Sequence, residues 1–253
     1  MSVPADEFWS TLPLGREVGL LCHDANGLAA CDKPAGILSH PNEAADGPRS
    51  LLTCRYDPEA ECYVWTDATG GERRLWLLNR LDGATSGVIL VAADGALARV
   101  VKERFAQKKV RKVYQALVFG KPAERFQVWR DLLAVQKTGA QVRTRAVHGH
   151  IPATTQMHFL RPGQGDFSTS LLRLEPHTGR THQLRVQCAK RRLPIVGDQT
   201  YGDFALNREL AKASGQKRLF LHALETAFSY EIGGRRFEFK ATAPLPREFQ
   251  AAY

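Results

Sequence analysis

Cysteine is scarce in this sequence, and long apolar runs are missing. The chain has five cysteines in 253 residues, an odd number with no C-x-x-C pair. Neither a disulfide framework nor a zinc site is expected, and buried reduced thiols are the simpler interpretation. No apolar stretch approaches the roughly 18 to 20 residues of a membrane helix, and the first twenty residues lack the basic start and apolar middle of a secretion signal. These absences predict a cytoplasmic protein without a membrane partner.

Recognisable ligand patterns for metals and cofactors are missing as well. The one close pair among the eight histidines is His177 and His182, and a Thr-Gly turn signal lies between them. The sequence contains no phosphate-binding loop and no dinucleotide-binding fingerprint. We therefore expect neither a metal nor a cofactor.

Positive charge is in clear excess. The chain has 35 Lys and Arg against 26 Asp and Glu, which gives a formal net charge of +9. Such a balance favours a polyanionic partner, either nucleic acid or an anionic surface. Many basic proteins bind no nucleic acid, so the charge alone leaves the partner open.

Short apolar runs bounded by turn residues predict a sheet with few helices. Strands are expected at 18–23, 27–33, 75–79, 87–93 and 113–119, at several places within 127–175, and at 218–230 and 235–242. The first two form a hairpin around the turn at 24–27, and loops are expected at 34–49 and 194–203. This pattern predicts an α+β fold with a mixed, largely antiparallel sheet flanked by helices and loops.

Two segments have helical periodicity. Residues 95–109 place Leu97, Val100, Val101 and Phe105 on one face, with basic residues on the other. Residues 181–193 fit either a strand or a helix, and we favour the helix.

The segment NRLDGATSG (79–87) places Asp82 between two predicted strands. From local chemistry alone, Asp82 is best interpreted as a turn residue whose carboxylate accepts backbone N–H bonds. The functional interpretation is a carboxylate kept ionised by a nearby cation so that it can attack an electrophilic carbon. Thr85, Ser86 and Gly87 are interpreted as turn formers.

Two basic segments make the functional interpretation of Asp82 stronger. Tyr114 follows a stretch with seven Lys or Arg and one acid over 99–112. A solvated helix face would explain such a run, but basic residues beside an aromatic also suit a surface that tracks phosphates and stacks bases. The second segment, HTGRTHQLRVQCAKRRLPIVGDQTYG (177–202), offers Arg180 and Arg185 as counter-charges for a carboxylate.

Five ordered elements resemble the RluA-type family of pseudouridine synthases. NRLDGATSG resembles the family's H-R-L-D-x-x-T-S-G signature, and RKVYQALVFG resembles its K-x-Y segment. TGRTHQLRVQCAKRRLPIVGDQTYG resembles G-R-T-H-Q-[IL]-R-V-H…P-I-x-G-D-x-x-Y-G. CDKPAGILSHP and KRLFLHA resemble its N-K-P-x-G-x-x-x-H-P and R-L-x-L-H-A elements, so the set covers about residues 20–243. The resemblance implies a synthase catalytic domain over 16–253 and no separate N-terminal RNA-binding domain. Residues 1–15 are weakly patterned, and we expect them to form an N-terminal arm or a short cap.

The resemblance also assigns roles to individual residues. Asp82 would be the nucleophile for cleavage of the uracil–ribose bond, whether it adds to the base, attacks C1′ or starts a glycal route. Arg185 would keep Asp82 ionised, with Arg180 as the alternative partner, and Tyr114 would stack on the flipped uracil. The implied partner is structured RNA, either rRNA or tRNA, and the protein is expected to be a monomer. The residues expected to contact this RNA are Arg80, Lys109, Arg111, Lys112 and Arg180.

Two positions depart from the family pattern. Asn79 and Gln187 stand where the family usually has His. Both substitutes form hydrogen bonds, so an active enzyme that isomerises a specific uridine is still expected. The alternative is a catalytically silent RNA-binding or RNA-folding factor on the same scaffold, which would not need to keep Asp82, Tyr114 and Arg185. His182 and His222 are expected to form hydrogen bonds within the core.

Overall fold

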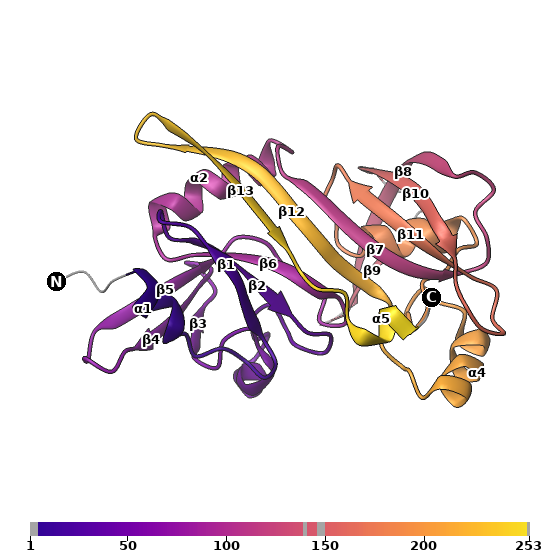
Figure 1. Ribbon diagram of the computed structural model, residues 1–253, viewed down its shortest axis with the longest axis horizontal. Helices are drawn as coiled ribbons and strands as arrows, with labels where there is room; N and C mark the ends of the chain where they lie inside the picture. Colours follow the sequence, from indigo (N-terminus) through magenta and orange to yellow (C-terminus); the bar gives the residue numbers. More distant parts are fainter. Residues whose placement is uncertain (1–4, 139–140, 146–149, 252–253) are drawn as a thin grey trace. The chain divides into compact units, whose positions relative to one another are not determined.

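Five α-helices and thirteen strands occur in the described part of the chain, which comprises residues 5–138, 141–145 and 150–251 (Figure 1). This computed structural model divides the polypeptide into two units, each discontinuous in sequence. Unit 1 contains Met1–Val110 and Glu225–Ala243, and unit 2 contains Arg111–Leu224 and Pro244–Tyr253. One division coincides with the start of a strand and another falls inside a strand. Only the third division, between Ala243 and Pro244, falls in a Pro-containing segment, so no linker signal marks the first two.

Unit 1 is a set of antiparallel ladders with a helix packed on them. The pairs are β3–β4, β4–β5, β5–β6, β6–β2, β2–β1 and β12–β13. Its elements are α1 (Ala5–Ser10), β1 (Gly19–His23), β2 (Leu28–Lys33), the 3-10 helix η1 (Ala44–Arg49), β3 (Arg55–Asp57), β4 (Cys62–Thr66), β5 (Glu72–Leu77), β6 (Ser86–Ala92), α2 (Gly95–Ala106), the larger part of β12 (Leu221–Ile232) and β13 (Arg235–Thr242). The predicted hairpin at 18–33 is confirmed as β1 and β2.

Strand β6 is buried on both faces, which explains its continuous apolar sequence SGVILVA. Val88 and Leu90 join one apolar cluster together with Leu97 of α2. Ile89 and Val91 face the other way, into a second cluster. Each fully buried aliphatic side chain contributes about 1.5–3 kcal/mol to folding. The strand that follows the Asp82 loop is therefore a rigid base for that loop.

The N-terminal residues are part of unit 1. Trp9 of α1 is 3% exposed and Leu12 is 8% exposed, and both join the second cluster. In its described part, the predicted arm over 1–15 is thus a short cap on the core. Helix α2 begins as predicted, with the Asp94 side chain accepting a hydrogen bond from the Leu97 N–H, and its last residue is Ala106.

Unit 2 is an antiparallel sheet in the order β7-β11-β10-β8-β9. Its elements are β7 (Arg111–Phe119), β8 (Phe126–Thr138), β9 (Gln141–Arg145), β10 (Ile151–Pro162), β11 (Thr169–Pro176), α3 (Gln183–Lys190), α4 (Phe204–Ser214), the first residues of β12, and α5 (Arg247–Ala251). The antiparallel strands predicted within 127–175 are confirmed, apart from residues 139–140 and 146–149, which lie outside the described residues. The α+β class is confirmed.

Helix α3 lies against one face of the unit 2 sheet. Leu184 and Cys188, one turn apart, pack with Trp129 of β8, Met157 of β10 and Leu172 of β11. The spacing of Leu184 and Cys188 is the i, i+4 spacing of one helix face, while Val186 packs in a separate cluster with Leu133 and Ala153, so the helix is buried on more than one side. The helical interpretation of 181–193 is therefore confirmed for Gln183–Lys190.

Two features are absent from the described residues. No helix in this part of the chain has the length and apolar character needed to cross a membrane. Within the same residues, no group of three or more His, Cys, Asp and Glu side chains could hold a metal ion.

Candidate active site

Asp82 lies in the loop between β5 and β6 of unit 1, as predicted. Its carbonyl accepts a hydrogen bond from the Thr85 N–H at 2.9 Å, which closes a four-residue turn. Asp82 is partly exposed, whereas Thr85 and Ser86 are buried at the base of the loop. The turn-forming role inferred for residues 85–87 agrees with this arrangement.

The ammonium group of Lys33 holds the C-terminal side of the Asp82 loop. Lys33 is fully buried, and its Nζ donates to the carbonyls of Pro34 at 3.0 Å, Ile37 at 2.6 Å and Gly83 at 3.2 Å. The Gly83 carbonyl also accepts from the Gly36 N–H at 2.7 Å. An ammonium has three donors, so this cage accounts for all of them and makes its burial tolerable.

Ser39 holds the other side of the same loop. Its hydroxyl donates to the Leu81 carbonyl at 2.8 Å and accepts from the Leu81 N–H at 2.9 Å. Residues 81 and 83 are thus both tied to the segment 33–39. The C-D-K-P-A-G-I-L-S element and the N-R-L-D element, about 45 residues apart, form one local structure.

Asn79 and Arg80 lie in the same loop, just before Leu81 and Asp82. The Asn79 side-chain oxygen accepts from the Leu90 N–H of β6 at 2.7 Å and so extends the contact between the two strands. Arg80 is partly exposed and lines a pocket of about 160 Å³ together with Lys102 of α2 and Glu61. The Lys102 Nζ is 2.5 Å from a Glu61 carboxylate oxygen. Arg80 is therefore accessible, as an RNA contact must be.

Tyr114 and its basic neighbours lie on or next to β7. Tyr114 is partly buried against the cluster that includes Leu184, and Lys109 is exposed. The Arg111 Nε is 3.2 Å from a Glu175 carboxylate oxygen on β11.

Lys112 is turned inward. Its Nζ donates to the Thr178 carbonyl at 3.4 Å, and burial lowers its pKa from 10.5 to about 8. Of the predicted phosphate contacts, Lys109 and Arg111 are thus presented to solvent more fully than Lys112.

Arg185 lies on α3 and forms a buried bidentate ion pair. Its Nε and Nη2 donate to the two carboxylate oxygens of Asp198, each at 2.8 Å. Asp198 also accepts from the N–H groups of Thr200 and Tyr201. Burial raises the pKa of Asp198, but the Arg185 guanidinium and these N–H groups outweigh it and hold that pKa below its usual range. The ion pair joins the G-R-T-H-Q-L-R and P-I-V-G-D segments and fixes the plane of the guanidinium.

Arg180 and His182 directly precede α3, and His182 is its N-cap residue. Arg180 is exposed, and its Nε donates to the Pro152 carbonyl at 3.4 Å. His182 has a left-handed backbone, with φ of 54°, and its Nδ1 is 2.9 Å from the Tyr201 hydroxyl. The hydrogen bond expected for His182 is present, but its side chain is only partly buried and does not lie in the core.

The predicted catalytic residues belong to different units. Asp82 and Arg80 are in unit 1, and Tyr114 and Arg185 are in unit 2. The contacts described above for each of these residues come from its own unit. The pairing of Asp82 with Arg185 stays a prediction.

Comparison with known proteins places these segments in one family. A model of the family described as RNA pseudouridylate synthase matches residues 27–190, a range that contains Asp82, Tyr114 and Arg185. The chain belongs to this family. The family's enzymes are isomerases that act on RNA, and the resemblance inferred from the ordered motifs is confirmed.

Individual relatives of this chain agree with the family match. An uncharacterised RNA pseudouridine synthase of Chloroflexus aurantiacus is 35% identical over 223 residues, which cover 87% of this chain and 63% of the relative. The tRNA pseudouridine synthase C of Haemophilus ducreyi is 34% identical over 221 residues, with 85% and 86% covered. The structure of human RNA pseudouridylate synthase domain containing 1 has a TM-score of 0.67 at 23% identity and covers 93% of this chain and 87% of its own. The chain thus spans a little under two thirds of the Chloroflexus relative, and the likeness to the human structure supports the fold.

Several residues that shape these segments of the synthase were not singled out from the sequence. Lys33 and Ser39 lie in the K-P-x-G element, and Asp198 lies in P-I-V-G-D. Lys33 and Asp198 are charged residues inside otherwise apolar or turn-forming motifs, and this was the sequence signal that could have identified them as buried, paired charges. Asp131 of β8, which bonds to Gln187, lies outside every motif and had no such signal.

Proposed function

We propose that this chain isomerises a uridine of structured RNA to pseudouridine, with Asp82 as the nucleophile. The observation that carries the proposal is the clamp on the Asp82 loop, in which Lys33 binds Gly83 and Ser39 binds Leu81. A carboxylate on a loop fixed on both sides needs little reorganisation when it reacts. An ordinary surface turn has no need of a buried ammonium cage.

In the proposed reaction the N1–C1′ bond of uridine breaks, the uracil turns, and a bond forms between C5 and C1′. C5 loses a proton and N1 gains one, so no atom is added and nothing is oxidised or reduced. Tyr114 stacks on the flipped uracil and takes part in the proton transfer from C5. Arg80, partly exposed near the nucleophile in sequence, enters the space that the flipped nucleotide leaves.

Arg185 is the proposed counter-charge of Asp82. A guanidinium has five N–H donors, and Asp198 accepts from Nε and Nη2. The same group has the capacity to serve a second carboxylate while Asp198 holds its plane. Lysine could not do both, because it is a point charge without a fixed donor geometry.

The proposed substrate is tRNA or rRNA, and tRNA is the first to test. A relative at 34% identity is a tRNA pseudouridine synthase C. The net charge of +9 suits either RNA. This substrate implies that the enzyme works in the cytoplasm.

The decisive experiment compares Asp82→Asn with Asp94→Asn. Asp94 lies in the same unit and caps α2, a role that Asn fills equally well, so it controls for the loss of one carboxylate. Purified wild type and Asp94→Asn should form pseudouridine in cellular RNA without added cofactor. Asp82→Asn should form none and should still bind RNA.

Mapping pseudouridines in RNA from cells with and without the gene identifies the target. Full turnover by Asp82→Asn would exclude the proposed nucleophile. Equal pseudouridine levels in both RNA samples, with RNA binding retained, would instead support a catalytically silent RNA-binding factor.

A further inference from the structure

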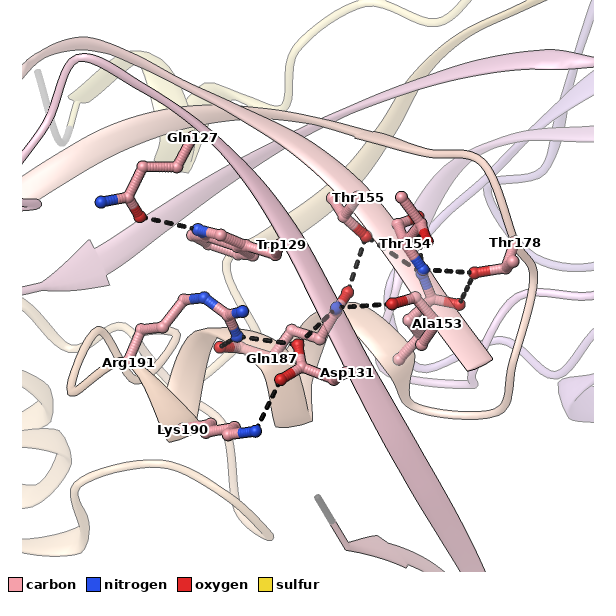
Figure 2. A network of polar contacts seen from close by, with 11 residues as sticks. Gln127, Trp129, Asp131, Ala153, Thr154, Thr155, Thr178, Gln187, Lys190 and Arg191 are labelled. Carbon is pink, nitrogen blue, oxygen red and sulfur yellow. Dashed lines mark hydrogen bonds and ion pairs between the residues drawn. The ribbon is translucent and has the colours of Figure 1, made fainter. Parts of the chain in front are cut away.

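A chain of hydrogen bonds runs through the interior of unit 2 from Thr178 to Asp131 (Figure 2). The Thr178 hydroxyl donates to Gln183 Oε1 at 2.7 Å, and Gln183 Nε2 donates to Thr155 Oγ1 at 3.0 Å. The Thr155 hydroxyl donates to Gln187 Oε1 at 2.6 Å, and Gln187 Nε2 donates to Asp131 Oδ2 at 2.7 Å. All five side chains are buried. Every donor in the chain points the same way, toward Asp131.

Asp131 sets this direction. Its side chain is 1% exposed, and its oxygens also accept from Lys190 Nζ at 2.7 Å and Arg191 Nη1 at 2.9 Å. In Figure 2 the side chains of Gln187, Lys190 and Arg191 all point toward this carboxylate. Burial raises the pKa of Asp131, but the hydrogen bonds from Lys190, Gln187 and Arg191 outweigh it and hold the pKa below its usual range.

An ionised carboxylate can only accept hydrogen bonds. Gln187 must therefore turn its amide nitrogen toward Asp131 and its oxygen toward Thr155. The Thr155 hydroxyl must then donate to Gln187 and accept from Gln183, and the same constraint orients Gln183 toward Thr178. The charge of Asp131 thus determines the orientation of the Gln187 amide and the Thr155 hydroxyl. Two backbone groups hold Gln183 in the same sense, because the Arg180 N–H donates to its Oε1 at 3.1 Å and the Thr154 carbonyl accepts from its Nε2 at 3.2 Å.

This chain of hydrogen bonds fixes the position of α3 on the unit 2 sheet. Gln183 and Gln187 are one turn apart on α3, and Arg185 lies between them in sequence. Their partners Thr155 and Asp131 come from β10 and β8. The apolar contacts of α3 are not directional and would tolerate a small rotation or slide. The buried hydrogen bonds are directional and would not.

We propose that Asp131 and Gln187 are positioning residues for the isomerisation, because they fix the rotation and register of α3 and thereby the direction of the Arg185 guanidinium. This inference rests on the proposed function, in which Arg185 faces Asp82. It also gives Gln187 a role at a position where the family usually has His. An amide offers a donor and an acceptor at once, as this place in the chain requires.

The first test is Asp131→Asn in the full-length protein. One carboxylate oxygen becomes an NH₂ group that faces the donors of Gln187, Lys190 or Arg191, so α3 must shift or the chain must reverse. We expect kcat for pseudouridine formation to fall by up to about 100-fold, the scale for a catalytic group displaced by about 1 Å. KM for the RNA should stay within about twofold of wild type, because none of these residues contacts the proposed substrate.

The double variant Asp131→Asn, Gln187→Glu tests the direction of the chain. It moves the carboxylate one place along, to position 187, where it accepts from the Thr155 hydroxyl and from the amide introduced at position 131. We expect kcat to recover about tenfold over the single variant, a coupling of ordinary size for residues in contact. Gln187→Glu alone places two carboxylates face to face and should not be active at the wild-type level.

Thr155→Val interrupts the hydrogen-bond chain at a second place and changes no charge and little volume. It replaces Asp131→Asn as the test if that variant does not fold. It should also lower kcat and leave KM unchanged. Wild-type kcat in Asp131→Asn or Thr155→Val would overturn the inference, and so would a double variant that recovers nothing. The proposed function fails separately, if wild type forms no pseudouridine or Asp82→Asn forms as much as wild type.

Discussion

The buried Lys33 ammonium offers the sharpest test of how the Asp82 loop is held. Lys33→Met keeps the length of the side chain and removes the donors to Pro34, Ile37 and Gly83. The Gly83 carbonyl keeps its bond from the Gly36 N–H, so two carbonyls lose a donor. A carbonyl that loses its partner costs about 1–3 kcal/mol where water cannot replace the donor, which gives an upper bound of roughly 2–6 kcal/mol for the two, since Pro34 and Ile37 are only partly buried. Relief of the ammonium's desolvation offsets part of this cost, so we expect unit 1 to lose about 2–4 kcal/mol.

The measurement is urea unfolding followed by fluorescence, with Lys240→Met as the matched control. Lys240 lies in the same unit, and its Nζ is 2.9 Å from a Glu225 carboxylate oxygen, but its side chain is 65% exposed. Its removal should change the free energy of unfolding by less than about 1 kcal/mol, as for other exposed ion pairs. Equal losses in the two variants would refute the idea that the Lys33 cage holds the loop. Folded Lys33→Met should also turn over more slowly than the control, because the Asp82 loop has lost one of its two anchors.

Two further predictions concern pH. The pKa values of Asp131 and Asp198 are lowered in the folded state, so their contribution to stability is complete above the unfolded Asp pKa of about 3.9 and is lost as pH falls through the lower folded values. The free energy of unfolding, measured with urea from pH 6 down to 2.5, should therefore decrease. An equal decrease in Asp131→Asn would contradict a contribution of Asp131 to this pH dependence. The pKa of Lys112 is lowered from 10.5 to about 8, so the unfolded chain holds that proton more tightly and the free energy of unfolding should rise from about pH 8 to 10. Lys112→Met should flatten this rise in the same titration, and a rise that persists would show that another group causes it.

Local patterns predicted the elements well, because each pattern has a local physical cause. The apolar run 87–93 became β6, which is buried on both faces. The period in 95–109 became α2, with its start at the Asp94 cap. The turn chemistry of N-R-L-D-G correctly placed Asp82 on a loop between two strands.

The contacts that shape the candidate site were not predictable in the same way, because they join distant parts of the chain. Lys33 and Gly83 are 50 residues apart, and Asp131 and Gln187 are 56 apart. No propensity or spacing rule connects such positions in a single sequence. The ordered motifs did bring the segments together, but they carried no information about which side chain bonds to which. Arg185 was expected to pair with Asp82, and its bidentate bond to Asp198 was not foreseen.

The discontinuous division of the chain has a consequence for how the protein folds on the ribosome. Unit 1 takes most of its residues from the first 110, but Phe228, Tyr230 and Phe239 of its main apolar cluster come from β12 and β13. At about 5–20 residues per second, these strands follow the rest of the unit by about 6–23 s. During that interval, while unit 2 is being synthesised, the apolar side chains of β6 and α2 that pack against β12 and β13 in the folded protein lack these partners. The first core is therefore completed only after residues Arg111–Leu224 of unit 2 have been synthesised, and the nascent N-terminal part is a natural client for a chaperone.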